Sequence, residues 1–315
     1  NMNVSILSAL AWGGVLAAGV LWGGGALVAH GLMAQGMSPA SLALARFALG
    51  LPLLWWWHAA QRGAGGRWRA LPLRHRMLVA GSGVAMALNV TCWFAAIALM
   101  GATLPTVISI CCAPLFVAGV SVLRGYERAS WRLGVALVLA LCGVVLIVRP
   151  ASGWVLPAGH ALGVGLSLAS AALQAGGVLA NARMPAAVSP VSASAWGMTA
   201  AALAMALVVL PQGLTWPVGT MGWLGVAYTG VVTTSVAYLL FAWGSRRITP
   251  TAAGLGILVE PLATALLAAW LLSQPLAPLQ WAGAALMGAA LALMASADTY
   301  RSKASTMPRN GMLNQ

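Results

Sequence analysis

Long apolar stretches alternate with short polar ones along most of the 315-residue chain. A membrane-spanning helix needs about 20 consecutive apolar residues, and most of these stretches reach that length. The pattern predicts ten spans, at 4–28, 38–59, 77–100, 101–123, 129–149, 161–183, 190–211, 221–245, 250–272 and 276–297. We therefore expect an all-α integral membrane protein whose last span is followed by a polar, disordered tail at 298–315.

The composition agrees with this class of protein. Hydrophobic residues make up 61% of the chain and charged residues only 6%, with a mean hydropathy of +0.90. In a soluble domain about a quarter of the residues are charged. The composition therefore excludes a soluble globular protein.

The formal net charge of +13 raises the question of a nucleic-acid partner, and the placement of the charges answers it. Most basic residues lie in the second, fourth, sixth and eighth loops and in the tail: Arg62, Arg67, Arg69, Arg74, Arg76, Arg124, Arg128, Arg132, Arg183, Arg246, Arg247, Arg301, Lys303 and Arg309. Positive residues concentrate in the cytoplasmic loops of membrane proteins. The pattern therefore predicts that both termini and the tail are cytoplasmic, and that the protein has no nucleic-acid partner.

Two apolar stretches contain a proline at corresponding places. Pro114 lies in the fourth predicted span and Pro261 in the ninth, 147 residues further on. Proline removes one backbone hydrogen bond from a helix and bends it. Interrupted helices at matching positions of two halves are typical of transporter binding sites, so we predict hinges at Pro114 and Pro261.

The chain divides into two halves of five spans each, at 4–150 and 155–297. Because five is an odd number, the second half must enter the membrane in the opposite orientation to the first. The sequence thus predicts ten transmembrane helices arranged as two inverted five-helix repeats, which is an arrangement used for alternating access.

Polar and aromatic side chains inside the spans are the candidates for binding a substrate. They are Trp22, Asn89, Trp93, Ser109, Cys112, Gln174, Tyr228, Ser235, Tyr238 and Glu260. The aromatic rings offer apolar and cation–π surfaces, and the hydroxyl and amide groups offer hydrogen bonds. We expect a central cavity formed by the first, third, fourth, sixth, eighth and ninth spans.

Two charged residues lie well inside the spans. Glu260 either has a structural role, bonded to Thr264 or to carbonyls freed by Pro261, or faces the cavity and binds a substrate ammonium or a proton. Arg46 either reaches the outer headgroups, faces water, or pairs with a carboxylate. The sequence leaves both sets of alternatives open.

An intramembrane enzyme would need nucleophiles, bases or metal ligands clustered inside the membrane. The four histidines, His30, His58, His75 and His160, lie at or near span ends, and no spacing indicates a triad or a metal site. We therefore expect neither an enzyme nor a cofactor or metal. A passive channel would use the same polar faces as a carrier, and counterflow distinguishes the two because only a carrier shows it.

The order of several short motifs resembles a known family. Trp22-Gly23 in the first span, Arg46-Phe47 in the second, and a proline in the fourth and ninth look like the drug/metabolite transporter superfamily, EamA type, over about 4–297. That family often has an acid after the fourth span, here Glu127, and another after the ninth. At the second place this chain has Leu272-Ser273-Gln274-Pro275 and no acid.

The resemblance implies a secondary transporter that exports small metabolites across the bacterial inner membrane by alternating access. Exporters of amino acids, including aromatic or apolar ones, form a prominent branch of the family. A passive channel or facilitator for another small metabolite or drug is the alternative. The expected partners are a small-molecule substrate and the lipid bilayer, and the protein itself is expected to be a monomer.

Overall fold

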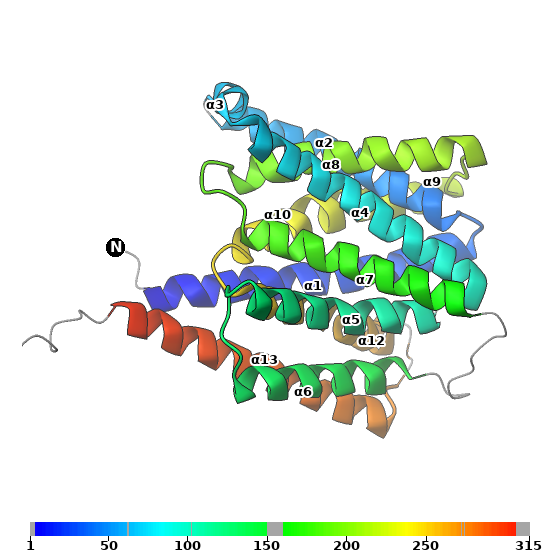
Figure 1. Cartoon of the computed structure of the whole chain (residues 1–315). Helices are drawn as coiled ribbons and strands as arrows, with labels where there is room; N and C mark the ends of the chain where they lie inside the picture. The colour runs from blue at the N-terminus through cyan, green and yellow to red at the C-terminus, as the bar shows by residue number, and fades with distance from the viewer. Residues whose placement is uncertain are drawn as a thin grey trace, which may run out of the picture.

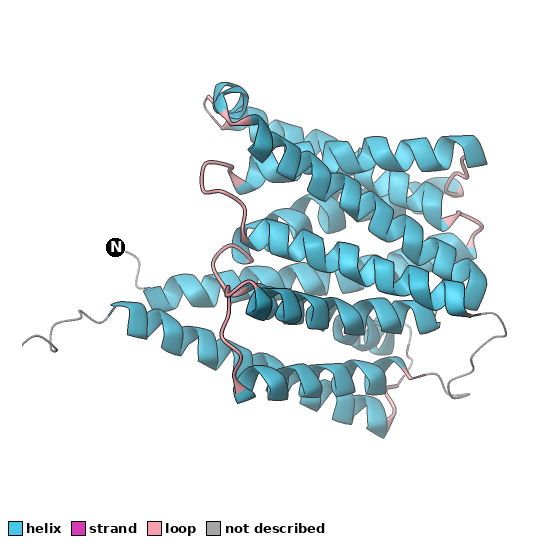
Figure 2. Cartoon of the chain, in the orientation of Figure 1, coloured by secondary structure: helices cyan, strands magenta, loops and turns pink. Residues whose placement is uncertain are grey.

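The computed structural model describes residues 4–61, 63–101, 103–149, 160–271, 273 and 275–306. Every regular element in these ranges is helical (Figures 1 and 2). The elements are α1 (Val4–Ala34), α2 (Pro39–Ala60), α3 (Ala64–Ala70), α4 (Leu73–Met100), α5 (Thr103–Leu123), α6 (Trp131–Val148), α7 (Ala161–Ala182), α8 (Pro190–Val209), η1 (Leu210–Gln212), α9 (Gly219–Tyr228), η2 (Thr229–Val236), α10 (Ala237–Gly244), α11 (Pro250–Ile257), α12 (Val259–Leu271) and α13 (Pro278–Thr306).

Ten helical segments within these ranges are long and apolar enough to cross a membrane, so the predicted number of spans is confirmed. The seventh span joins α8 to η1, the eighth joins α9, η2 and α10, and the ninth joins α11 and α12. Some helices are longer than predicted, because α1 continues to Ala34 and α4 already begins at Leu73.

The last helix also continues further than the sequence predicts. α13 runs to Thr306, through the first part of the stretch that we expected to be a disordered tail. Residues 298–306 contain neither proline nor glycine, so no helix-breaking residue ends the helix where its apolar segment ends. Residues 307–315 lie outside the described part of the chain.

The two proline-containing spans differ in their backbones. The ninth span is divided at Leu258, between α11 and α12 and shortly before Pro261. The interruption expected at Pro114 is absent, because α5 is continuous through that residue. A proline costs a helix one hydrogen bond, and neighbouring helices in a membrane bundle can hold the rest of the helix together.

Three spans begin with the same kind of capping sequence. The hydroxyls of Ser38, Ser189 and Thr249 each accept a hydrogen bond from the backbone N–H three residues later, and a proline follows each of them. A hydroxyl at the N-cap and a proline at the first helical position are both favoured at helix starts. The second and seventh spans share the motif more closely, as Ser-Pro-Ala-Ser and Ser-Pro-Val-Ser.

The helices of the two halves pack in matching pairs. α1 packs against η2, α10, α11 and α12, and its counterpart α7 packs against α4 and α5. Likewise α2 packs against η2, and its counterpart α8 packs against α4. The pairs α2–α8 and α6–α13 each join equivalent helices of the two halves. Exchanging the halves therefore turns each contact of the first kind into another one, and turns the α2–α8 and α6–α13 contacts into themselves.

Two close helix crossings are also related to each other by exchanging the halves. A methyl group at Gly83 would overlap with the carbonyl oxygen of Gly197, where α4 meets α8. A methyl group at Gly50 would lie 2.9 Å from the carbonyl oxygen of Gly230, where α2 meets η2. Only glycine permits backbones to approach so closely. Gly83 and Gly230 are 147 residues apart, and so are Gly50 and Gly197, which makes the crossings equivalent in the two halves.

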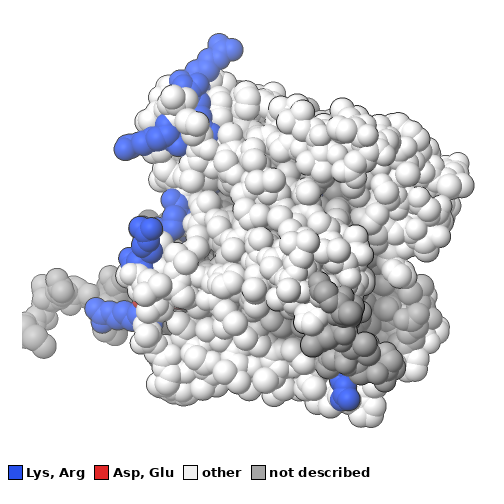
Figure 3. Space-filling model, turned by 45° about the vertical axis from the view of Figure 1, so that its right-hand side comes forward, with Lys and Arg blue, Asp and Glu red and all other residues white. Residues whose placement is uncertain are grey.

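The two halves also start at opposite ends of the bundle. In Figure 1, α1 starts at the left-hand end and α7 at the right-hand end. The basic side chains visible in Figure 3 gather mainly at the end where α1 begins, which is also the end that carries α3 with Arg67 and Arg69. One end of the bundle is thus strongly positive, and the flanks between the ends are apolar.

A buried carboxylate joins the two halves at this basic end. Glu127 lies in the connection between α5 and α6 and is only 6% exposed. One of its carboxylate oxygens accepts a hydrogen bond of 2.8 Å from the backbone N–H of Thr251. Thr251 lies in the first turn of α11, a helix whose eight residues are all buried. Glu127 of the first half therefore caps the most deeply buried helix of the second half.

Candidate functional site

A cavity of about 390 Å³ lies between the two halves. Its walls come from α1, α2, α4, α7, α8, η2, α10, α11 and α12. This volume lies within the range of about 300–1,000 Å³ that is usual for small-molecule sites in proteins. The cavity is therefore large enough to enclose a small metabolite.

Six of the ten candidate binding residues line this cavity: Trp22, Asn89, Trp93, Gln174, Tyr238 and Glu260. The second and seventh spans, which we did not expect in the wall, contribute to it through α2 and α8. The fourth span does not line it, although we expected it to do so. The prolines Pro114 and Pro261 instead lie together in the wall of a small adjoining pocket, which shares Gln174 and Glu260 with the cavity.

The other four candidates lie outside the cavity. Ser109 is buried between α5 and α7, with its hydroxyl 3.1 Å from the carbonyl oxygen of Ser167. Ser235 donates a hydrogen bond of 2.7 Å to the carbonyl oxygen of Gly50, where η2 packs against α2. The hydroxyl of Tyr228 lies against α1 at Gly24, and Cys112 lies on α5 outside the wall. Spacing along a helix defines a face, but it does not say which neighbour that face contacts.

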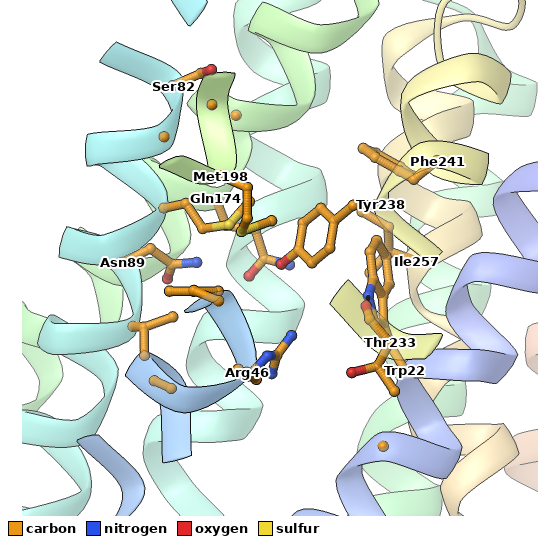
Figure 4. A pocket seen from close by; sticks show the side chains of 18 of the residues that line it. Trp22, Arg46, Ser82, Asn89, Gln174, Met198, Thr233, Tyr238, Phe241 and Ile257 are labelled. Atoms are coloured by element: carbon orange, nitrogen blue, oxygen red, sulfur yellow. Dashed lines mark hydrogen bonds between the residues drawn. The ribbon is translucent and has the colours of Figure 1, made fainter. Parts of the chain in front are cut away.

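One side of the cavity is aromatic (Figure 4). The indole N–H of Trp22 donates a hydrogen bond of 2.8 Å to the carbonyl oxygen of Thr233, which fixes α1 against η2. Its ring meets that of Tyr238 edge to face at a centroid distance of 5.0 Å, and that of Phe241 at 5.6 Å. Such pairs hold both rings in defined positions. This group presents a rigid, mostly apolar surface.

The other side carries amide groups. Ser170 donates a hydrogen bond of 2.6 Å to the side-chain oxygen of Asn89, and the hydroxyls of Ser170 and Ser109 lie 3.2 Å apart. The Asn89 oxygen is thereby occupied, and its amide N–H groups face the cavity (Figure 4). Ser109 thus supports the site from behind, through Ser170, although it does not line the cavity.

The π-helix η2 shapes the wall beside this cavity. The hydroxyls of Thr234 and Ser235 donate to the carbonyl oxygens of Thr229 and Gly230, five residues earlier in each case. Five-residue spacing is typical of the wider π turn, which often occurs at functional sites. The wide turn lets Thr233 line the cavity while the adjacent Thr234 contacts Arg46 of α2.

Among the described residues, Arg46 and Glu260 are the charged side chains that line the cavity. The Nε of Arg46 donates to the hydroxyl of Thr234 at 3.3 Å. The hydroxyl of Thr264 lies 2.9 Å from the backbone oxygen of Glu260 and 3.2 Å from that of Gly23, and no hydrogen bond joins it to the Glu260 carboxylate in the described part of the chain. Arg46 lines the cavity, which fits the alternative that it faces water, and no close ion pair joins it to a carboxylate within the described residues.

The sequence reasoning missed several lining residues on α2 and α8, among them Phe47, Ser194 and Met198. The signal was present in the shared Ser-Pro-x-Ser motif, which marks α2 and α8 as equivalent helices and suggests equivalent positions for them. In the described part of the chain no three His, Cys, Asp or Glu side chains are grouped as metal ligands would be.

A central cavity lined by seven of the ten membrane-spanning segments is typical of a polytopic membrane transporter. The chain belongs to the EamA-like transporter family, because the model of that family matches residues 7–149 and again residues 161–296. The two matches fall in the two halves of the bundle.

Known proteins agree with this assignment. The chain is 31% identical over 217 residues to the uncharacterized transporter YwfM of Bacillus subtilis (strain 168), which covers 68% of this chain and 71% of that protein. A solved crystal structure of a protein with 20% sequence identity matches 92% of this chain and 98% of its own, with a TM-score of 0.78. At this identity the second likeness shows that the two proteins share a fold.

Proposed function

We propose that this transporter exports small metabolites, foremost amino acids including aromatic or apolar ones, across the bacterial inner membrane. The observation that carries the proposal is the composition of the cavity. Aromatic rings line the cavity on both sides, amide groups lie on the side formed by α4 and α7, and one positive and one negative side chain complete the wall. Such a lining suits a ligand that combines an apolar side chain with a polar, charged head group.

We further propose that the halves are inverted repeats that move by alternating access. The exchange of helix contacts between the halves supports this, as do the equivalent glycine crossings and the opposite starting ends of α1 and α7. Bends at Pro114 and Pro261, together with the interruption at Leu258, would let the ninth and fourth spans change shape as the cavity opens to either side. Binding with a Kd of about 1 mM, or roughly −4 kcal/mol, suffices to export an abundant metabolite.

The charge distribution supports a cytoplasmic position for the basic end of the bundle, and therefore for both termini. In this orientation the Glu127 contact with α11 lies at the cytoplasmic end. An exported substrate enters the cavity from this side.

Counterflow in liposomes tests the proposal. Purified protein is reconstituted into vesicles that contain unlabelled phenylalanine or leucine, and the uptake of the labelled amino acid is measured. A carrier gives saturable uptake that the internal amino acid accelerates, whereas a passive channel gives uptake that rises linearly with concentration. Absence of transport for every amino acid tested would refute the proposed substrate class.

Two tyrosines of the eighth span provide a matched pair of variants. Tyr238→Ala removes part of the aromatic wall and should raise the half-saturation concentration for phenylalanine. Tyr228→Ala removes the same side chain outside the cavity and should leave the half-saturation concentration unchanged. Equal effects of the two variants would show that the aromatic wall does not contact the substrate.

A further inference from the structure

Arg46 has a position that the fold does not explain by itself. It lies on α2, within a membrane span, and its side chain is directed into the cavity (Figure 4). An arginine stays charged at any physiological pH, so its burial in a membrane protein calls for a compensating partner. A positive charge kept at such a place is a candidate for a functional site.

Among the described residues, the contacts to the guanidinium group lie at its Nε atom and toward the Phe47 ring. The Nε atom donates to Thr234 on η2, and the guanidinium carbon lies 5.7 Å from the centroid of the adjacent Phe47 ring. Within the described residues, no hydrogen bond engages the two terminal nitrogens. These nitrogens point into the open space between α2 and the pair formed by Trp22 and Tyr238 (Figure 4). The two N–H donors at this free edge of the planar guanidinium group match the two oxygens of a carboxylate.

The complementary charge comes from the other half of the protein. Glu260, on α12, lines the same cavity, and neither a hydrogen bond nor an ion pair joins its carboxylate to Arg46 in the part of the chain described. The two opposite charges attract each other across the cavity, but without a direct contact each keeps hydrogen-bonding capacity that a ligand can satisfy. A ligand with a negative and a positive end satisfies both groups at once, whereas an amine or an acid satisfies only one.

We propose that Arg46 binds the carboxylate of the substrate while Glu260 binds its ammonium group, so that the cavity selects zwitterionic amino acids over amines and carboxylic acids of the same shape. This inference rests on the proposed function and adds the basis of its specificity. The amide of Asn89 is a second donor for the carboxylate, and the aromatic wall takes the side chain. Because the two charges come from different halves, a bound zwitterion links α2 of the first half to α12 of the second.

Three ligands of related shape test the roles of Arg46 and Glu260 separately. Phenylalanine carries both, 2-phenylethylamine lacks the carboxylate, and 3-phenylpropionate lacks the ammonium group. Counterflow of labelled phenylalanine is measured in liposomes, with the other two as inhibitors. The same ligands are titrated against the detergent-purified protein by tryptophan fluorescence, which reports binding independently of transport.

For the wild-type protein we expect phenylalanine to be transported and the two analogues to bind at least ten-fold more weakly. Arg46→Gln should raise the half-saturation concentration for phenylalanine by roughly 10- to 100-fold, since it removes a charged hydrogen bond. It should leave the weak binding of 2-phenylethylamine unchanged. Glu260→Gln should show the converse pattern, with the binding of 3-phenylpropionate unchanged. Arg247→Gln, at an exposed arginine outside the cavity, is the matched control and should behave as the wild type.

The outcomes separate this inference from the proposed function. If the wild type transports no amino acid, the proposed function is wrong. If it transports phenylalanine and Arg46→Gln keeps the wild-type half-saturation concentration, the assignment of Arg46 alone is wrong. If Arg46→Gln does not fold, Arg46→Lys is measured in its place. It keeps the positive charge but loses the paired N–H donors of the guanidinium group, so it should still weaken phenylalanine binding without changing the binding of 2-phenylethylamine.

Discussion

The hydrogen bond between Glu127 and α11 leads to a quantitative prediction about stability. Glu127→Ala removes a buried carboxylate that accepts from the backbone N–H of Thr251, in the first turn of a fully buried helix. A hydrogen bond to a charged group contributes about 1.5–3 kcal/mol, and a negative charge at a helix N-terminus adds about 0.3–1 kcal/mol. We therefore expect Glu127→Ala to lower the free energy of unfolding by about 2–4 kcal/mol.

Two further variants isolate the cause. Glu127→Gln keeps an acceptor oxygen and loses the charge, so it should cost only about 1 kcal/mol. Arg128→Ala changes an exposed neighbour in the same connection and should stay within about 0.5 kcal/mol of the wild type. Unfolding is followed by tryptophan fluorescence and far-ultraviolet circular dichroism during titration with SDS in mixed micelles. Equal stability of wild type and Glu127→Ala would refute the reasoning, because the carboxylate would then contribute nothing to the capping of α11.

Three more predictions concern topology, hinges and coupling. In a background without native cysteines, Gly66→Cys should resist an impermeant thiol reagent added to intact cells while Gly213→Cys is labelled, and the reverse pattern would invert the assigned orientation. Pro114→Ala and Pro261→Ala should express normally but slow the transport rate, whereas wild-type turnover in both would limit the prolines to a packing role. If Glu260 also takes up a proton during the cycle, the transport that Glu260→Gln retains at saturating phenylalanine should no longer depend on pH. An unchanged pH profile would exclude this residue as the proton carrier.

Much of the fold could be predicted because membrane thickness and water impose simple rules on the chain. Each span must be apolar over a fixed length, so ten spans follow directly from the pattern. The helix ends were harder to place, as α1 and α4 show, because a helix can continue past its apolar segment when no capping signal stops it.

The cavity was predicted only in part, because its lining depends on tertiary contacts between helices. Trp22 and Tyr238 could be chosen because aromatic rings inside spans offer apolar and cation–π surfaces to a substrate. Ser109 and Ser235 have the same sequence signature as cavity residues, yet they bond to backbone carbonyls of neighbouring helices. A hydroxyl inside a membrane needs a partner, and the sequence does not say whether this partner is a ligand or a helix.

The π-helix explains why the orientation of Arg46 was left open. Its contact with Thr234 depends on the five-residue turn in η2, which an analysis based on the regular α-helical period does not anticipate. The continuity of α5 through Pro114 is a similar case. Proline marks where a helix loses a hydrogen bond, but the neighbouring helices decide whether the helix also divides there.

The glycine crossings restrict how the two halves can move. At Gly83 with Gly197, and at Gly50 with Gly230, backbone touches backbone, and each crossing joins a helix of one half to a helix of the other. A helix that slid lengthwise would bring a residue with a side chain into a gap that admits only hydrogen, whereas a helix that tilts about the contact keeps the glycines in place. The two crossings are thus pivot points about which the halves can tilt against each other. Gly83 and Gly197 line the cavity itself, so in the proposed transport cycle a rotation about this crossing would open the ends of the bundle while a bound substrate stays close to the axis.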